Sequence, residues 1–179
     1  MNVNDAVALI RDAVGDASGV WADLGAGTGT FTRALTRILG ADSTIYSVDA
    51  DANAVAALRT LASTTPTRII PVRADFTRPF DLPELGDALL DGMLLANSLH
   101  FVPNAELVLS QLARRVRVGG RVVVVEYDRR APGRWVPYPI DAARWPQLAT
   151  SAGLVRAAVT ATRPSAYAGV LYVGVALRA

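Results

Sequence analysis

The sequence predicts a single doubly wound α/β domain, with a mostly parallel sheet that ends in an antiparallel hairpin. Three observations support this fold class. Apolar runs that suit buried strands alternate with helical patterns from Val20 to Val125. A glycine-rich turn separates the first of these runs from the helical pattern after it. Two strand-like runs near the end of the chain have no room for a crossover helix between them, so they should pair antiparallel.

The first half of the chain alternates regularly between helix and strand. An amphipathic helix begins near Asn4, and Asp51 is a suitable cap for a later Ala-rich helix. The apolar run that starts at Val20 leads straight into the glycines. We expect helices over 4–14, 31–39 and 52–61, and further strands over 44–49 and 68–73.

The second half is punctuated by proline and glycine. Residues 76–85 and 129–139 are proline-rich and predict loops. Gly119 and Gly120 are expected to end a helix, and Gly153 to end another. We expect helices over 105–116 and 140–152, and strands over 89–96, 122–125, 154–160 and 169–177.

The turn Gly25-Ala26-Gly27-Thr28-Gly29 predicts a cofactor site. Such a turn brings bare backbone N–H groups and the positive end of a helix close to a ligand. Asp49 ends the next strand, where an acid can accept hydrogen bonds from ribose hydroxyls. A dinucleotide site has the pattern G-x-G-x-x-G, and Thr30 stands where its third glycine is needed. A nicotinamide-dependent oxidoreductase is therefore the alternative, not the preferred interpretation.

The spacing from Asp23 to Gly29 resembles the D-x-G-x-G-x-G motif of class I, Rossmann-like, S-adenosylmethionine-dependent methyltransferases. The likeness runs from about Val20 to Glu126, and its pieces come in the family's order. They are Asp49, the pair Asp75-Phe76, the fourth-strand segment 91–101, and the turn and fifth strand at 117–126, where Val118 replaces the usual proline. Within the class, the chain resembles the small-molecule group of the type 11, ubiquinone–menaquinone biosynthesis kind.

The resemblance implies a seven-stranded sheet with its last strand reversed, and S-adenosyl-L-methionine as cofactor. It places Asp23 near the methionyl ammonium and the three glycines against the methionine part. Asp49 and its neighbour Ala50 would take the ribose, while Asp75 and Phe76 would take the adenine edge. Asn97 would lie beside the transferred methyl group. Asp49 and Asp75 also have plain structural interpretations, as a helix cap and a loop-initiating acid.

His100 is the only histidine in the chain. It is either a structural hydrogen-bonding residue or a general base that acts on the methyl acceptor. Glu126 and Tyr127 end the fifth strand on the same edge, as a satisfied acid and a packing residue or as part of the site. Trp135 either covers an acceptor pocket or anchors its loop.

Composition excludes several functions. The 179 residues suit one domain, 1–179, with an N-terminal helix in 1–18 and a candidate lid in 129–139. There is no cysteine, no lysine and no metal-ligand spacing, so no metal is expected. Net charge is only +2, and nucleic-acid binding is not expected.

No membrane span or signal peptide is apparent, so we expect a cytoplasmic enzyme. We also expect its methyl acceptor to be a small molecule. A homodimer that completes the pocket, or a non-catalytic cofactor-binding subunit, are the other expectations.

Overall fold

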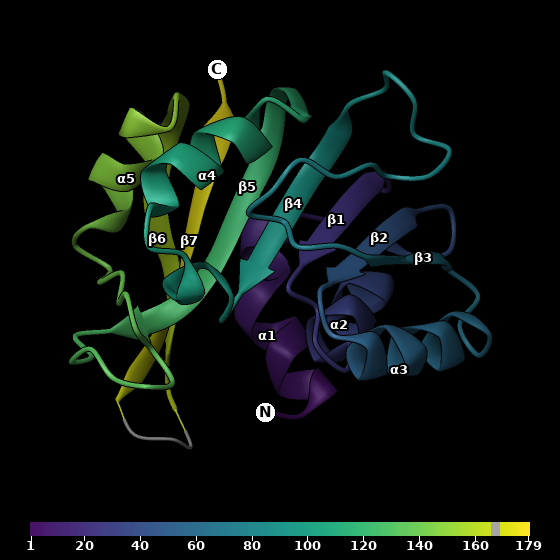
Figure 1. The fold of residues 1–179 in the computed structure, drawn as a ribbon, viewed down its shortest axis with the longest axis horizontal. Coiled ribbons are helices and arrows are strands. Elements are labelled where there is room, and N and C mark those ends of the chain that lie inside the picture. The colour runs from purple at the N-terminus through teal and green to yellow at the C-terminus, as the bar shows by residue number, and fades with distance from the viewer. Residues whose placement is uncertain (166–168) are drawn as a thin grey trace.

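The computed structural model describes residues 1–165 and 169–179, and its centre is one twisted sheet (Figure 1). Within this part the sheet has seven strands in the order β3-β2-β1-β4-β5-β7-β6. The strand β7 runs opposite to the other six, so its pairs with β5 and β6 are the antiparallel ones, which confirms the predicted fold class. The strands are β1 (Val20–Leu24), β2 (Thr44–Asp49), β3 (Arg68–Arg73), β4 (Leu90–Ala96), β5 (Val116–Asp128), β6 (Leu154–Pro164) and β7 (Val170–Arg178).

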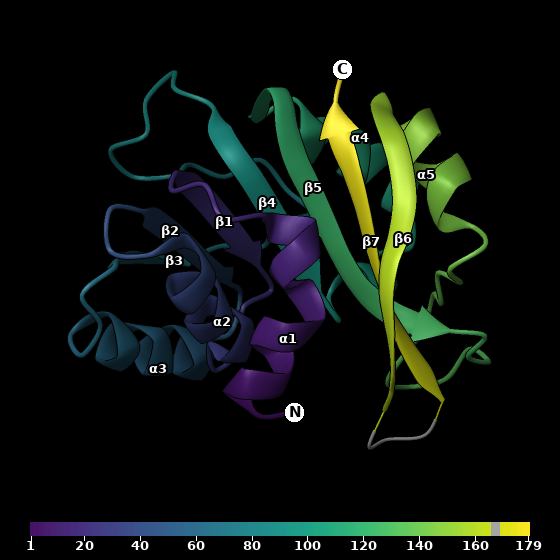
Figure 2. The same cartoon turned by 180° about the vertical axis from the view of Figure 1, so that it is seen from behind.

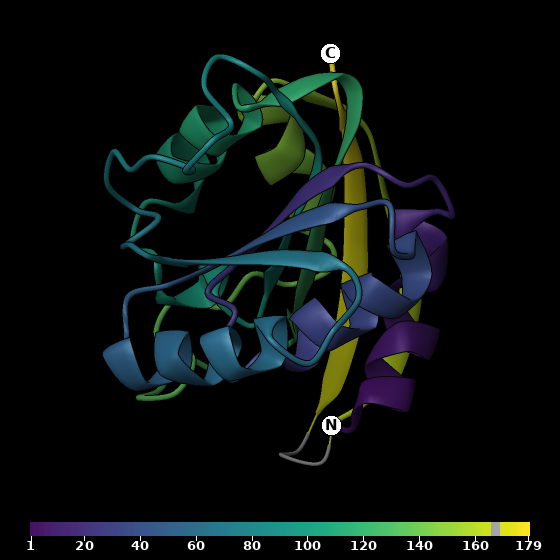
Figure 3. The ribbon, with the colours of Figure 1, turned by 90° about the vertical axis from the view of Figure 1, so that its right-hand side faces the viewer.

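Helices cover both faces of the sheet (Figures 2 and 3). One face carries α1 (Val3–Val14), α2 (Thr30–Leu39) and α3 (Ala52–Ala62). The other carries α4 (Ala105–Ala113) and α5 (Trp145–Ser151), and a short 3-10 helix, η1 (Leu99–Phe101), follows β4. Within residues 1–165 and 169–179, no helix has the length and apolar character needed to cross a membrane.

The central strands are buried on both faces, and this explains their nearly continuous apolar runs. In β5, Val122 and Val124 pack into the core under α4 and α5, together with Trp145. Val123 and Val125 point the other way and pack with residues of α1 and α2. The alternation along one strand therefore fills two cores.

The predicted helix starts agree closely with the structure in the first half of the chain. The first helix begins one residue early, at Val3, because the side chain of Asn2 caps it by accepting from the Asp5 N–H at 2.9 Å. Asp51 caps α3 as predicted and accepts from the N–H groups of Asn53 and Ala54.

The predicted helix over 105–116, with Gly119 and Gly120 as its end, is wrong in its second part. The helix ends at Ala113, and Val116 already pairs with Leu90 of β4. Both glycines lie inside β5, where the register shifts. A Cβ on Gly120 would stand 2.5 Å from the Val116 Cγ1 and 2.7 Å from the Asp91 carbonyl oxygen. The glycine therefore permits a close approach of two strands and does not end a helix.

The predicted helix over 140–152 is also shorter, since it begins only at Trp145. Residues 141 and 142 are held by the end of β5 instead: Asp141 accepts from the Arg129 N–H and Asp128 accepts from the Ala142 N–H, both at 3.0 Å. These two bonds close the base of the 129–139 loop. The strand after α5 runs beyond the expected residue 160, to Pro164.

Candidate functional site

The three glycines of the turn after β1 serve different purposes. All have positive φ, at 78°, 54° and 85° for Gly25, Gly27 and Gly29, which explains why glycine is used there. A Cβ on Gly25 would stand 2.5 Å from the Ser98 Cβ, and one on Gly29 would stand 2.9 Å from the Leu58 Cδ2. A Cβ on Gly27 would meet nothing within 4 Å. Gly27 is therefore the glycine that faces open space.

Asp49, at the end of β2, supports this turn. Its Oδ2 accepts from the Gly27 N–H at 2.8 Å and its Oδ1 accepts from the Asp51 N–H at 2.9 Å. A carboxylate has about four acceptor positions, so each oxygen keeps one for a ligand. Asp49 and Ala50 both line a cavity of about 660 Å³.

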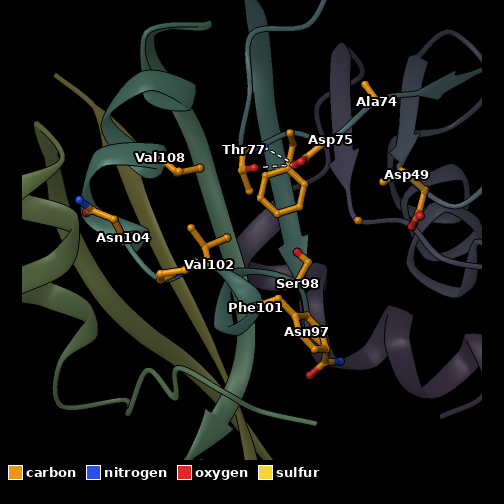
Figure 4. A pocket seen from close by; sticks show the side chains of 14 residues that line it. Asp49, Ala74, Asp75, Thr77, Asn97, Ser98, Phe101, Val102, Asn104 and Val108 are labelled. Carbon is orange, nitrogen blue, oxygen red and sulfur yellow. Dashed lines mark hydrogen bonds between the residues drawn. The ribbon is translucent and has the colours of Figure 1, made fainter. Parts of the chain in front are cut away.

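Asp75 and Phe76, after β3, line the same cavity. Figure 4 shows Asp75 with its neighbour Thr77. Asp75 is exposed, and its Oδ1 accepts from the Thr77 N–H at 2.9 Å and the Thr77 hydroxyl at 2.6 Å. These hydrogen bonds lower the pKa of Asp75, so the group is a carboxylate at neutral pH. It is thus both a loop-initiating acid and an available acceptor on the cavity wall.

The Asp23 side chain contacts α2 behind the glycine turn. It is buried, and its Oδ2 accepts from the Thr32 hydroxyl of α2 at 2.6 Å. Burial raises the pKa of Asp23 to about 7. Neither Asp23 nor Gly29 lines any of the three cavities that meet at the carboxyl end of β4.

These three cavities share Asn97, directly after β4. The first is the one lined by Asp49. The second, of about 610 Å³, lies along the glycine turn and reaches α1 and the end of β6. An ion pair of 2.8 Å between Asp5 of α1 and Arg163 of β6 joins these two elements. The third, of about 460 Å³, lies between His100 and the 129–139 loop. Asn97 lines all three.

The conformation of Asn97 is unusual. Its φ is +54°, in the left-handed region. Its Oδ1 is buried, and among the described residues it is the one buried side-chain polar atom with no hydrogen-bond partner. A strained backbone and an unsatisfied acceptor at a junction of cavities both indicate a place where a ligand supplies the missing donor.

His100 is buried and held by Glu126. Its Nδ1 lies 2.5 Å from the Glu126 Oε2. The Glu126 Oε1 accepts from the backbone N–H groups of Leu99 and His100, at 3.0 and 3.2 Å. Burial raises the pKa of Glu126, and the hydrogen bonds from His100 oppose that rise. We assign the ring proton to Nδ1, because the carboxyl oxygen accepts there, so the lone pair is on Nε2. His100 lines the third cavity.

The sequence named Glu126, Tyr127 and Trp135 as candidates beside His100, but it did not show that Glu126 pairs with His100 or that Arg130 lines the third cavity. Phe101, Tyr127, Arg130 and Trp135 line that cavity together with His100. The available signal was topological: β4 and β5 are adjacent and parallel, so the residues that follow β4 lie beside those that end β5. Among the described residues, no three His, Cys, Asp or Glu side chains gather as a metal site.

A family model described as "Methyltransferase domain" matches residues 22–124. A comparison with curated protein sequences finds no match. Many solved structures share the fold. An Aquifex aeolicus SAM-dependent methyltransferase has a TM-score of 0.73 at 15% identity, with 95% of this chain and 88% of that chain covered. The arsenic(III) S-adenosylmethionine methyltransferase CrArsM of Chlamydomonas reinhardtii has a TM-score of 0.74 at 16% identity, with 99% and 73% covered.

A third similar structure was solved with ligands. It is the Burkholderia thailandensis 1,6-didemethyltoxoflavin-N1-methyltransferase, with 1,6-didemethyltoxoflavin and S-adenosylhomocysteine bound. Its TM-score is 0.73 at 20% identity, with 98% of this chain and 77% of that chain covered.

Proposed function

Since this chain belongs to the Methyltransferase domain family and is an S-adenosylmethionine-dependent methyltransferase of the class I fold, we propose that its acceptor is a small molecule whose hydroxyl group is deprotonated by His100. The observation that carries this proposal is the buried His100–Glu126 pair, which lies beside a cavity that adjoins the glycine turn at Asn97. Membership of the methyltransferase family rules out the alternative of a nicotinamide-dependent oxidoreductase.

The residues around the first two cavities fit the cofactor. When bound, S-adenosylmethionine supplies an electrophilic methyl group on a sulfonium sulfur. Asp49 has one acceptor position left on each oxygen for the ribose hydroxyls. Asp75 offers a carboxylate to the adenine amino group, and Phe76 lines the same wall. No atom lies within 4 Å of the place where a Gly27 Cβ would be, so the cofactor has room to approach the backbone of the turn there.

We place recognition of the methionyl ammonium on Asn97 in preference to Asp23. The Oδ1 of Asn97 is buried without a donor, and an ammonium group would satisfy it. The Thr32 hydroxyl donates a hydrogen bond to Asp23 behind the turn, and the raised pKa leaves the Asp23 carboxyl partly protonated at neutral pH. Its role is then to hold α2 against β1.

His100 moves one proton in the proposed reaction. Glu126 fixes the ring through Nδ1, and Nε2 accepts the proton of the acceptor hydroxyl. The hydroxyl oxygen gains the methyl group, while the electron pair of the broken S–C bond stays on sulfur as a neutral thioether. The proton then leaves Nε2 for water. General-base help of this kind contributes roughly 10²- to 10⁴-fold in rate.

Two observations favour a small molecule as the acceptor. The third cavity, of about 460 Å³, is within the usual size range of small-molecule sites. The Burkholderia thailandensis neighbour is named for a small-molecule acceptor.

The test uses two conservative variants and two readouts. In Glu126→Gln, an amide N–H replaces the acceptor at Nδ1, so the ring proton is forced onto Nε2 and the base is lost. His100→Gln removes the imidazole itself. Both should lower the single-turnover rate by about 10²-fold or more. Calorimetry should give an unchanged Kd for S-adenosylmethionine, which also shows that the variants fold. Near-normal rates in both variants would leave His100 a structural residue.

A further inference from the structure

The third cavity has walls made mostly of aromatic rings. Phe101 and Trp135 are exposed, at 52% and 73% of their surface, and both line it. The His100 ring lies 4.4 Å from that of Phe101 and 6.1 Å from that of Tyr127, measured between ring centroids. Exposed aromatic side chains gathered around one hollow are typical of a surface that a flat apolar ligand covers.

The charge of this cavity is one-sided. Among its described lining residues Arg130 is the charged one, and its guanidinium lies 4.5 Å above the Tyr127 ring. Arg134 lies 5.6 Å from the neighbouring Trp135 ring. Glu126 is fully buried behind His100, and Asp128 and Asp141 lie at the base of the 129–139 loop, outside the lining of this cavity. The cavity therefore favours a neutral or anionic ligand and disfavours a cation.

The base of the cavity limits where a reacting group can lie. His100 is only 2% exposed, and its carbonyl oxygen accepts from the Tyr138 N–H at 3.0 Å, so the 129–139 loop is attached to the residue that it covers. With Nδ1 engaged by Glu126, Nε2 is the atom that a ligand can reach. Phe101, Trp135, His100 and Asn97 all line this one cavity, so a ring that stacks on either aromatic side chain has room for an edge hydroxyl near His100 and Asn97.

We infer that the third cavity binds a planar hydroxylated aromatic molecule, neutral or anionic, as the methyl acceptor. This inference rests on the proposed function, because it names the substrate class for the same site. It assigns Trp135 and Phe101 to the ring, Arg130 to the charge preference and His100 to the hydroxyl. The 460 Å³ of the cavity admits a compound of one or two rings.

Trp135 gives a direct readout of binding. Trp21 and Trp145 are buried, at 3% and 0% exposure, so the emission of exposed tryptophan comes from Trp135. Para-hydroxybenzoate should quench that emission, excited where the probe does not absorb. Hydroxycyclohexanecarboxylate, with the same polar groups and no aromatic ring, should not. Tyramine, a cationic phenol, should bind at least 10-fold more weakly than para-hydroxybenzoate.

Single substitutions test whether the quenching arises in this cavity. The quenching should vanish in Trp135→Phe, and Trp135→Ala should raise KM for the phenol about 10-fold. The matched control is Val118→Ala: Val118 is equally exposed, at 73%, but lies at the other end of β5. Quenching that persists in Trp135→Phe, or equal binding of the cyclohexane compound, would overturn the inference.

The experiments distinguish a failure of the aromatic acceptor site from a failure of the proposed methyl transfer. The quenching needs no cofactor, so it tests the aromatic site even if calorimetry detects no S-adenosylmethionine. Cofactor binding together with methylation of the aliphatic probe alone would refute the aromatic site and leave methyl transfer standing.

Discussion

Alanine substitution at three different glycines distinguishes three effects: backbone strain, steric clash with a neighbour, and loss of space for the ligand. Gly25, Gly27 and Gly86 all have positive φ, so alanine at any of them costs about 1 kcal/mol of backbone strain. Only at Gly25 does the new Cβ meet a neighbour, 2.5 Å from the Ser98 Cβ. Carbon atoms at van der Waals contact are about 3.5–4.0 Å apart. Overpacking of this kind costs about 1–3 kcal/mol more.

We therefore expect Gly25→Ala to lower the free energy of unfolding by about 3 kcal/mol. Gly86→Ala should lower it by only about 1 kcal/mol, because nothing lies within 4 Å of the new methyl group. Gly27→Ala should match Gly86→Ala in stability. It should nevertheless weaken S-adenosylmethionine binding more than 10-fold, because its methyl group enters the space of the turn.

The assays are denaturant unfolding followed by circular dichroism, and calorimetric titration with S-adenosylmethionine. Equal stability losses in Gly25→Ala and Gly86→Ala would refute the role given to the Ser98 contact. An unchanged Kd in Gly27→Ala would mean that the cofactor does not approach this turn.

Three further predictions concern single polar side chains. Asp49→Ala should raise the Kd for S-adenosylmethionine by one to two orders of magnitude, roughly 1.5–3 kcal/mol. The control is Asp51→Ala, which should lower the free energy of unfolding by about 1 kcal/mol because the α3 cap is lost. Its Kd for S-adenosylmethionine, measured by calorimetry, should be nearly unchanged. Asp23 has a folded pKa of about 7, above its unfolded value, so the folded state holds a proton that the unfolded state has lost; stability should fall as pH rises from about 4 to about 7, by roughly 4 kcal/mol at most. Unfolding of Asp23→Asn across this range should show a flatter profile, and identical slopes in both proteins would contradict the assignment. Tyr46→Phe should lower the free energy of unfolding by about 1 kcal/mol, because it removes the 2.8 Å hydrogen bond that holds the Pro83 carbonyl to β2, and a melting temperature equal to that of the original chain would disprove this.

Periodicity and turn residues were sufficient to predict the strands and most helices, because the central strands are buried on both faces and the helices on one. They failed where tertiary contacts override local preference. Gly119 and Gly120 resemble a helix end in sequence, but the approach of Asp91 places them inside a strand. Pro146 favours a helix that starts at Trp145, because proline suits the first turn and has no N–H to donate to residue 142. Two hydrogen bonds at the end of β5 then hold residues 141 and 142 outside the helix.

The candidate site was predictable in its loops and less so in its side-chain directions. The spacing placed Asp49, Asp75 and Asn97 at one edge of the sheet, and the structure brings all three to the same cavity. Spacing could not show that Asp23 points to Thr32 on α2, because both faces of a strand are open to a carboxylate until the packing is known. The pairing of His100 with Glu126 likewise depends on the register of β4 and β5.

The division of the cavities along the chain has a practical consequence for redesign. Tyr127, Arg130, Trp135 and Val136 all come after residue 124, where the family match ends. The segment that carries most of them is closed at its base by the Asp128 and Asp141 hydrogen bonds, and the Tyr138 N–H joins it to the His100 carbonyl oxygen. Exchanging residues 129–139 between those two aspartates would change the choice of acceptor and leave the glycine turn intact. Asn97 is the wrong position to randomise for that purpose, since it lines all three cavities and any change there alters every one at once.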